Sequence, residues 1–231
     1  MYKRILLKIS GEALAGEEKS GIDPKVVGEI ADRIKEVVLK GIQVGIVVGG
    51  GNFWRGRDGH EMERTTSDYM GMLATVINGL AFQDALKSRG VEAVVQTSIE
   101  MNVVAEPYTR RNSEKYLSEG KVVIFAAGTG HPYFSTDTCA ALRAVEMKAD
   151  AILVAKTVDG IYSADPKIDP NAIKYDEISY NEILSKNLQA MDTASTALCM
   201  ENNMPLVVFS IYDTENIVRA ANGENIGTTV K

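Results

Sequence analysis

The segment that decides the fold is Val122-Val-Ile-Phe-Ala-Ala-Gly-Thr-Gly-His-Pro-Tyr-Phe-Ser-Thr-Asp-Thr138. It begins with an apolar run of strand length, Val122–Ala126, and the residues that follow Ser135 have helical spacing. A strand that ends in a glycine-rich loop and leads into a helix presents free backbone N–H groups at the positive end of the helix dipole. The segment therefore predicts an α/β unit with an anion site. Its hydroxyls and Asp137 favour a ligand that is both phosphorylated and polar, such as a nucleotide.

Similar apolar runs recur on both sides of this segment. They cover Ile5–Ile9, Ile42–Val48, Val91–Val95, Ala151–Ala155 and Pro205–Phe209. Their continuous apolarity is typical of strands covered on both faces in a mostly parallel sheet. Amphipathic segments between the runs predict helices from Asp23-Pro24 to Gly41, from Thr66-Ser67 to Lys87, from Ser135-Thr136 to Lys148, and over Tyr180–Lys186, Thr193–Asn202 and Glu215–Ala221. We expect one α/β domain over residues 1–231, a three-layer α/β/α sandwich with a mostly parallel central sheet.

Charge and cysteine content narrow the class of protein. The 231 residues include 25 Lys and Arg against 31 Asp and Glu, with no long basic block, which argues against nucleic-acid binding. Cys139 and Cys199 lie far apart within apolar helical patterns, so we expect buried, reduced thiols. The first apolar run is too short for a signal peptide and no stretch is long enough to span a membrane. We expect a cytoplasmic protein without a membrane partner.

Two more predicted strands end in loops that resemble the glycine-rich loop after Val122–Ala126. The first strand ends in Lys8-Ile-Ser-Gly11, and the second ends in Gly49-Gly-Gly-Asn-Phe-Trp-Arg55. Each alone could be an ordinary tight turn. Three of them on one sheet edge indicate a ligand cleft, because ligands of open α/β sheets bind beyond the carboxyl ends of the strands. The chain has no GxxxxGK[ST] sequence, and Gly49-Gly50-Gly51 lacks the further glycine of a dinucleotide-binding fingerprint, so the phosphate site has another architecture.

An ordered set of motifs resembles the bacterial UMP kinases, which belong to the amino acid kinase family. The motifs are Lys8-Ile-Ser-Gly-Glu12, Gly49-Gly-Gly-Asn52 with Arg55, Asp68-Tyr-Met-Gly-Met-Leu73, Gly128–Asp137 and Val158–Pro166. The resemblance runs from about residue 3 to the C-terminus. It implies an amino acid kinase-like fold and ATP-dependent phosphorylation of UMP to UDP in pyrimidine nucleotide biosynthesis. It also implies Mg²⁺ carried with ATP and no metal site of the protein's own.

The resemblance places the acceptor, UMP, in the N-terminal part of the chain, about residues 1–150. Asp68 would bind the ribose hydroxyls, although a first-turn aspartate can also serve only the helix dipole. Thr136 would read the uracil edge, and His131 would replace an Asn that the family often carries. The UMP-binding residues implied are Gly50, Asp68, Thr129, Gly130, His131, Pro132, Tyr133, Phe134, Ser135 and Thr136.

Three side chains are candidates for the transfer itself. An ammonium at Lys8 could bridge the donor and acceptor phosphates, and a guanidinium at Arg55 could bind acceptor oxygens bidentately. The resemblance suggests that Asp137 organises Lys8 and the magnesium–phosphate cluster. Because the second pKa of a phosphomonoester is about 6, the acceptor oxygen is already largely ionised and needs no general base.

The resemblance places ATP on the C-terminal part, about residues 151–231, with contributions from the first two loops. The residues implied are Lys8, Ile9, Ser10, Gly11, Gly51, Arg55, Lys156, Thr157, Tyr162 and Asp165. The Asp159-Gly160 pair predicts a short hairpin turn in this region.

Quaternary structure and regulation follow only from the resemblance, which implies a homohexamer with GTP and UTP as effectors. The loop Gly16–Gly21 takes the place of a segment linked to GTP control. Two alternatives stay open: a kinase of a carboxylate or carbamate acceptor on the same fold, and a non-catalytic nucleotide-binding protein. The first alternative gives Asp68 and the loop Thr129–Thr136 no ligand group to bind, because its acceptors have neither ribose nor uracil. The second is disfavoured by the presence of Lys8 and Arg55.

Overall fold

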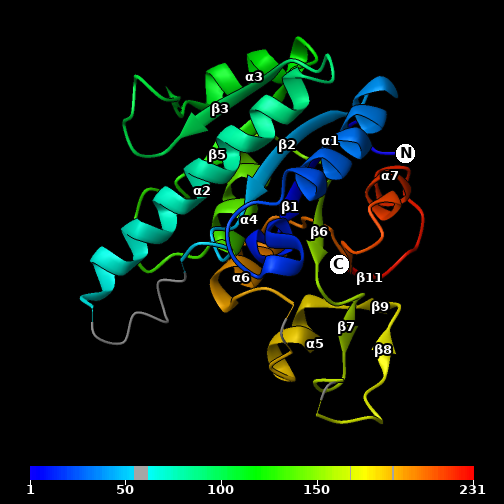
Figure 1. The fold of residues 1–231 in the computed structure, drawn as a ribbon. Helices are drawn as coiled ribbons and strands as arrows, with labels where there is room; N and C mark the ends of the chain where they lie inside the picture. The colour runs from blue at the N-terminus through cyan, green and yellow to red at the C-terminus, as the bar shows by residue number, and fades with distance from the viewer. Residues whose placement is uncertain (55–61, 167, 189) are drawn as a thin grey trace.

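The computed structural model describes residues 1–54, 62–166, 168–188 and 190–231. In this part of the chain nine strands form one sheet, in the order β4-β3-β5-β2-β1-β6-β10-β11-β9, and β7 and β8 form a separate hairpin (Figure 1). The strands are β1 (Arg4–Ile9), β2 (Gln43–Val48), β3 (Ala93–Thr97), β4 (Glu106–Pro107), β5 (Val122–Ala126), β6 (Ala151–Lys156), β7 (Ile161–Tyr162), β8 (Lys174–Tyr175), β9 (Glu177–Ile178), β10 (Leu206–Ser210) and β11 (Thr228–Val230).

Parallel pairing dominates the large sheet. From β4 to β10 every neighbouring pair is parallel, and the antiparallel pair is β10 with β11. The central strand is β1, in which Lys8 is paired with Val47 of β2 on one side and with Val154 of β6 on the other. The strands β2 to β5 therefore all lie on one side of β1 in the sheet, and β6 is the first strand on its other side.

Helices cover both faces of the sheet (Figure 1). They are η1 (Gly11–Glu18, a 3₁₀ helix), α1 (Pro24–Leu39), α2 (Arg64–Lys87), α3 (Arg110–Ser118), α4 (Thr136–Glu146), α5 (Tyr180–Ser185), α6 (Thr193–Glu201) and α7 (Glu215–Ala221). The side chains of Ile5, Leu7 and Ile9 share one core cluster with residues of α1, α2 and α7, whereas Leu6 shares another with residues of α3, α4, α5 and α6 on the opposite face. This alternation buries both faces of the strand and confirms the predicted three-layer α/β/α sandwich.

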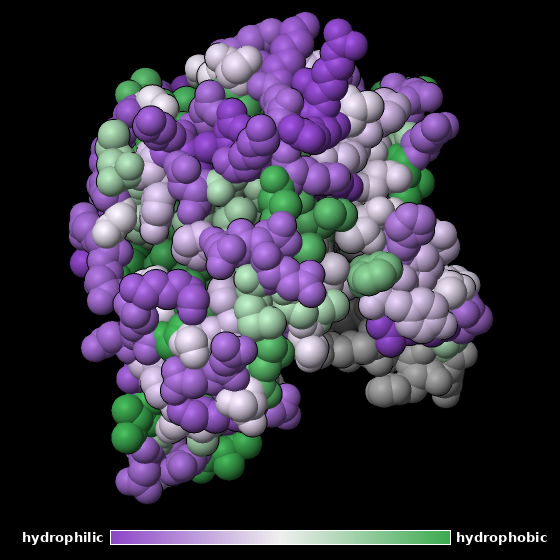
Figure 2. Space-filling model, turned by 180° about the vertical axis from the view of Figure 1, so that it is seen from behind, coloured by the Kyte–Doolittle hydropathy of each residue, from purple (hydrophilic) through white to green (hydrophobic). Residues whose placement is uncertain are grey.

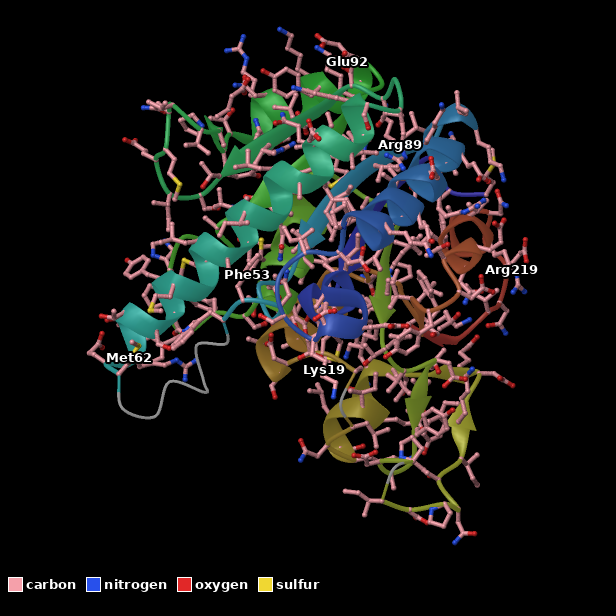
Figure 3. The ribbon with its side chains drawn as sticks, viewed as in Figure 1. Lys19, Phe53, Met62, Arg89, Glu92 and Arg219 are labelled. Carbon is pink, nitrogen blue, oxygen red and sulfur yellow. The ribbon has the colours of Figure 1, made fainter. Side chains whose placement is uncertain are left out.

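Helices α1 and α2 lie side by side and are joined at one end by an ion pair. Arg89, just after α2, reaches across to α1, where its Nε lies 2.7 Å from Oδ1 of Asp32 (Figure 3). At the other end of α2, Glu63 caps the helix by accepting hydrogen bonds from the backbone N–H groups of Thr65 and Thr66. The ion pair ties the end of α2 to α1, and the cap marks the start of α2 at Arg64.

The six predicted strands and six predicted helices all form, with ends shifted by at most two residues. Three short strands (β4, β9 and β11), the hairpin β7–β8, and the helices η1 and α3 complete the described part of the chain. None of the helices in that part is long and apolar enough to cross a membrane.

The predicted hairpin turn at Asp159-Gly160 is wrong. Strand β7 pairs in antiparallel fashion with β8, which lies after it in the sequence, and not with β6, which lies before the Asp159-Gly160 pair. Gly160 instead serves a close approach, because a Cβ there would lie 2.7 Å from Cε of Lys174 and from Oγ1 of Thr228. The Asp-Gly sequence resembles a turn signal, but the glycine is needed here for close packing.

Candidate active site

A cavity of about 840 Å³ lies at the carboxyl edge of the sheet, beyond the ends of β1 and β2. Figure 2 shows the surface hollowed between the lobe that contains β7, β8 and α5 and the lobe that contains the beginning of α2. The cavity is lined by Lys8, Ser10, Gly11, Glu12, Gly49, Gly50, Gly51, Trp54, Arg64, Asp68, Gly71, Met72, Thr75, Gly128, Tyr133, Phe134, Ser135, Thr136, Asp137, Thr138, Lys156, Met191, Asp192, Thr193 and Ala194.

Backbone forms one side of the cavity where the first two loops meet. A Cβ on Gly11 would lie 2.4 Å from the carbonyl oxygen of Gly49 and 2.8 Å from the backbone nitrogen of Gly51. No side chain fits in this space, so glycine at position 11 lets the two loops touch. The second loop is fixed from behind by Asn78, whose Nδ2 donates to the carbonyl of Gly49 at 2.7 Å and to Oδ1 of Asn52 at 2.7 Å. This wall can approach a phosphate closely without steric hindrance.

An ion pair crosses the middle of the cavity. The Nζ of Lys8, at the end of β1, lies 2.7 Å from Oδ1 of Asp137, in the first turn of α4. The side chain of Lys8 is 9% exposed and that of Asp137 18% exposed. Their attraction is therefore screened less by water than that of a surface pair. The predicted candidates Lys8 and Asp137 thus form one charged unit that faces the cavity.

The helices α4 and α6 begin at the cavity wall and are tied to each other. Asp192 caps α6, with Oδ1 accepting from the backbone N–H of Ser195 at 2.9 Å. Its other oxygen, Oδ2, accepts from the hydroxyls of Ser135 and Thr138 at the start of α4. Two positive helix ends therefore converge on one space, which favours an anionic ligand there.

A second lysine joins this region from the neighbouring strand. Lys156, the last residue of β6, donates to the carbonyl oxygen of Ala190 and lines the cavity. Burial lowers the pKa of Lys156, while Asp137 opposes the change and Lys8 adds to it. A phosphate placed here would favour the charged form of Lys156.

The far wall of the cavity comes from α2 and the glycine-rich loop. Oδ2 of Asp68 accepts from the backbone N–H of Tyr133 at 2.8 Å, and Nε of Arg64 lies 2.8 Å from the same oxygen. The guanidinium of Arg64 also lies over the ring of Tyr133, 5.4 Å from its centroid. The carboxylate of Asp68 thus links the helix to the loop and presents acceptor oxygens to the cavity, which suits a ligand with hydroxyl groups.

The structure brings twelve of the predicted site residues to this cavity: Lys8, Ser10, Gly11, Gly50, Gly51, Asp68, Tyr133, Phe134, Ser135, Thr136, Asp137 and Lys156. Ile9 is buried in the core beneath it. The predicted residues Thr129, Gly130, His131, Pro132, Thr157, Tyr162 and Asp165 do not line it. Arg55 lies outside the described residues. All ligand contacts of these residues stay predictions.

Among the lining residues that were not predicted, Arg64 and Asp192 are charged side chains that bond to predicted ones. Arg64 precedes Asp68 by four residues, the spacing at which helical side chains meet, and this signal could have been used. Asp192 directly precedes a predicted helix, the usual position of a capping residue. Its bonds to Ser135 and Thr138 are long-range contacts that no local pattern reveals.

The carboxylates that line the cavity do not form a metal-binding cluster in the described part of the chain. Within residues 1–54, 62–166, 168–188 and 190–231, no group of three or more His, Cys, Asp or Glu side chains is placed to hold a metal ion. The carboxylates of Asp137 and Asp192 line the cavity, on the first turn of α4 and at the start of α6. This donor set suits a Mg²⁺ ion that is held mainly by substrate phosphates.

Comparisons with known proteins agree with this geometry. Residues 3–210 match the model of the amino acid kinase family. The structure is similar to that of a UMP kinase from Bacillus anthracis, with a TM-score of 0.96, 40% identity and coverage of 100% of this chain and 96% of that one. It is also similar to a UMP kinase from Ureaplasma parvum, with a TM-score of 0.94, 42% identity and coverage of 100% and 99%. A uridylate kinase from Archaeoglobus fulgidus matches with a TM-score of 0.77, 30% identity and coverage of 98% and 99%. The chain therefore belongs to the amino acid kinase family.

Proposed function

We propose that the chain transfers the γ-phosphoryl group of ATP to UMP, giving UDP and ADP in pyrimidine nucleotide biosynthesis. The observation that carries this proposal is that one cavity holds both the Lys8–Asp137 pair and the Asp68–Tyr133 contact. The first supplies a cation for phosphate oxygens, and the second supplies a carboxylate for ribose hydroxyls. The similarity to proteins described as UMP kinases and uridylate kinase supports the same activity.

The reaction is an in-line displacement. An oxygen of the UMP phosphate forms a bond to the γ-phosphorus, and the bond from that phosphorus to the β–γ bridging oxygen breaks with its electron pair leaving on ADP. Because the second pKa of a phosphomonoester is about 6, the attacking oxygen is ionised at neutral pH without a base. The chain contributes positioning and positive potential, which is most of what this reaction requires.

The described residues divide these tasks between two parts of the cavity. Lys8 lies where it can contact the transferred group, and Asp137 fixes the position of its ammonium. The helix ends of α4 and α6, together with Lys156, favour the negative charge of the phosphates. We assign the acceptor to residues of about 1–150 and ATP to residues of about 151–231 with the loops after β1 and β2. Arg55 remains the predicted ligand of the acceptor phosphate.

Magnesium fits this site as a companion of ATP. Asp137 and Asp192 are the carboxylates at the helix starts, and one or two carboxylates plus phosphate oxygens are the usual surroundings of Mg²⁺ in kinases. When bound, the ion neutralises charge on the β- and γ-phosphates. Asp137 then has a second task besides holding Lys8.

The two alternatives, a carboxylate or carbamate kinase and a non-catalytic nucleotide-binding protein, account for fewer of the residues that line the cavity. An acetylglutamate- or carbamate-like acceptor has no ribose, so the carboxylate of Asp68 and its bond to Tyr133 would have no ligand to serve. A non-catalytic nucleotide-binding protein would not need the ammonium of Lys8, paired with Asp137, in the cavity. We therefore propose the UMP kinase reaction over both.

Association of copies and control by effectors belong to the same proposal. Tyr69, Leu73 and Ile77 are 44%, 47% and 48% exposed and recur every four residues on α2, so they form an apolar stripe on that helix. Such a stripe supports a homo-oligomer, for which the family resemblance implies a hexamer. Light scattering of the purified chain measures the mass, and activity with added GTP or UTP measures the effector response.

A coupled assay that follows ADP release with ATP and Mg²⁺ tests the function directly. The panel of acceptors contains UMP, CMP, AMP, GMP, dTMP, acetylglutamate and carbamate. Turnover confined to UMP supports the proposal. Turnover on acetylglutamate or carbamate establishes the first alternative, and nucleotide binding without turnover on any acceptor establishes the second.

A further inference from the structure

Arg143 is a buried cation that the reaction described above does not use. It lies on α4, it is 5% exposed, and it does not line the cavity. Its Nη1 lies 2.6 Å from Oε2 of Glu146, and its guanidinium stacks on Tyr108 with 3.4 Å between Cζ and the ring centroid. Burying a guanidinium costs free energy even when it is paired. The position of this side chain therefore needs an explanation beyond the local ion pair.

The guanidinium reaches the glycine-rich loop through one hydroxyl. Nη2 of Arg143 donates to Oγ of Ser98 at 2.9 Å, and Oγ of Ser98 donates to the carbonyl oxygen of Gly128 at 2.8 Å. Since Arg143 can only donate, the hydroxyl proton of Ser98 is left to point at Gly128. The three groups form a directed relay from a fixed charge to the start of the loop.

The loop at this point has a backbone that its own sequence does not favour. Ala127 has a φ of 59° and Gly128 a φ of 55°, both in the left-handed region. For an alanine this conformation is costly and persists only when the surroundings impose it. On the side of α2, Oγ1 of Thr75 accepts from the backbone N–H of Ala127 at 2.8 Å. The relay from Arg143 holds the other side.

Ser98 also contacts the next turn of the loop. Gly130 has a φ of 80°, and a Cβ on it would lie 2.9 Å from the carbonyl oxygen of Ser98. The backbone N–H of Ser98 donates to the carbonyl of Ala126 at 3.2 Å. Ser98 is thus in contact with the loop before, at and after Gly128, and its hydroxyl is the group that Arg143 orients.

We propose that Arg143 is a positioning residue for the acceptor: through Ser98 it fixes the path of the loop Gly128–Ser135, and thereby the affinity for the acceptor nucleoside. This inference rests on the proposed function for the identity of that acceptor, UMP. Loss of the relay frees the loop while Lys8 and the wall formed by Gly11 and Gly49 stay in place. The effect therefore falls on UMP and spares ATP.

The test compares Ser98→Ala with Ser113→Ala, a matched control. Ser113 also has a hydroxyl that is hydrogen-bonded, donating to Oε1 of Gln96 at 2.6 Å; it is more deeply buried than Ser98 and does not line the cavity. We expect Ser98→Ala to raise the KM for UMP about 5- to 10-fold, with the KM for ATP and kcat changed less than about twofold. Ser113→Ala leaves all three unchanged.

Arg143→Lys and the double variant test the link between the two side chains. If they act as one unit, adding Arg143→Lys to Ser98→Ala raises the KM for UMP no further. Arg143→Lys alone also gives a rise, because an ammonium cannot stack on Tyr108 and reach Ser98 with the same geometry. Equal KM values for Ser98→Ala and Ser113→Ala, or additive effects in the double variant, contradict the proposal.

Hydrogen exchange separates this inference from the proposed function. In the absence of any nucleotide, Ser98→Ala and Arg143→Lys should accelerate exchange in residues 127–134 at least fivefold, and Ser113→Ala should not. If wild-type protein fails to phosphorylate UMP, the proposed function is wrong, and the exchange data still decide whether the relay holds the loop. Unchanged exchange in both relay variants contradicts the relay itself.

Discussion

The ammonium of Lys8 lies 2.7 Å from the carboxylate of Asp137, and the two groups come from the end of the central strand and the first turn of α4. Since both groups line the cavity, where water can reach the carboxylate that remains, we expect removal of the cation to affect the reaction more than the fold. We expect Lys8→Met, which keeps the aliphatic volume, to lower kcat by about 10²-fold or more because charge on the transferred group is no longer neutralised. Steady-state kinetics with ATP and UMP measure the loss.

Lys121→Met is the control for this change. Lys121 lies 3.1 Å from Glu119 at the opposite end of β5 from the cavity, so its removal should leave kcat unchanged. A Lys8→Met protein that keeps more than about a tenth of wild-type kcat would remove Lys8 from the reaction.

Asp68 should matter for one substrate only. Its carboxylate faces the cavity from α2, and Asp68→Asn halves its capacity to accept hydrogen bonds from ribose hydroxyls. We expect the KM for UMP to rise about tenfold and the KM for ATP to change less than twofold. Asp84→Asn, an exposed change on the same helix, controls for the loss of negative charge. An unchanged KM for UMP would count against the ribose role.

Asp192 should contribute to both stability and activity. Asp192→Ala removes the cap of α6 and the bonds to Ser135 and Thr138, so we expect the free energy of unfolding to fall by about 1–2 kcal/mol. Asp23→Ala removes a comparable cap, on α1, without contact to α4. Urea titrations should show a loss in both variants, the larger one in Asp192→Ala, which also loses the bonds to Ser135 and Thr138. Activity should fall only in Asp192→Ala, and parallel activities would refute the coupling of the two helix ends.

Tyr180 should make stability depend on alkaline pH. Burial, with Cys199 nearby, raises the pKa of Tyr180, and its hydroxyl donates to the carbonyl of Met204. The unfolded tyrosine ionises near its ordinary value of about 10, whereas the folded one stays protonated, so the folded state binds more protons above that pH. The stabilisation is therefore complete below about pH 10 and is lost as the pH rises further.

Tyr180→Phe tests this dependence. At pH 7 we expect the variant to lose about 1–3 kcal/mol, because the Met204 carbonyl is left without its donor. Between pH 9 and pH 11 its free energy of unfolding should fall less steeply than that of the wild type. Tyr212→Phe, in an exposed ring, serves as the reference. Equal slopes in all three proteins would assign the pH dependence to other groups.

The two thiols should be inert in the folded protein. Burial raises the pKa of Cys139 to about 11 and that of Cys199 to about 12, so little thiolate exists at neutral pH. We expect no reaction with a disulfide reagent under native conditions and reaction of both cysteines after denaturation. Rapid labelling of the native protein would mean that α4 or α6 opens readily.

The layers of this fold can be predicted from the sequence because the patterns that mark its main strands and helices are local. Continuous apolar runs such as Ala151–Ala155 mark strands buried on both faces, and Asp23-Pro24 marks the start of a helix. Short strands such as β4 and β11 carry too few residues for any periodicity, and they form because β3 and β10 offer an open edge. Tertiary pairing creates these elements, so a single sequence does not predict them.

The residues of the site likewise fall into those that local patterns predict and those that depend on tertiary packing. Lys8, Asp137 and the glycine loops follow strand ends, and the topology of a parallel sheet gathers strand ends at one edge, so their meeting could be predicted. Asp192 bonds to the hydroxyls of Ser135 and Thr138, 57 and 54 residues away in the sequence, and Arg143 bonds to that of Ser98, 45 residues away. Such contacts depend on how α4 packs against α6 and against the loop after β3, and no spacing rule contains that packing.

The central place of β1 has a consequence for how the protein is made. Lys8 leaves the ribosome 148 residues before Lys156, yet β1 needs β6 as its second neighbour. At synthesis rates of about 5–20 residues per second, the apolar edge of β1 stays without that partner for roughly 7–30 s. A nascent chain of this length exposes one edge of β1, a strand of four apolar residues with Arg4 and Lys8, and other chains can pair with that edge. Production of the protein should therefore be limited by protection of the early strands during translation, before Lys8 has any cavity to line.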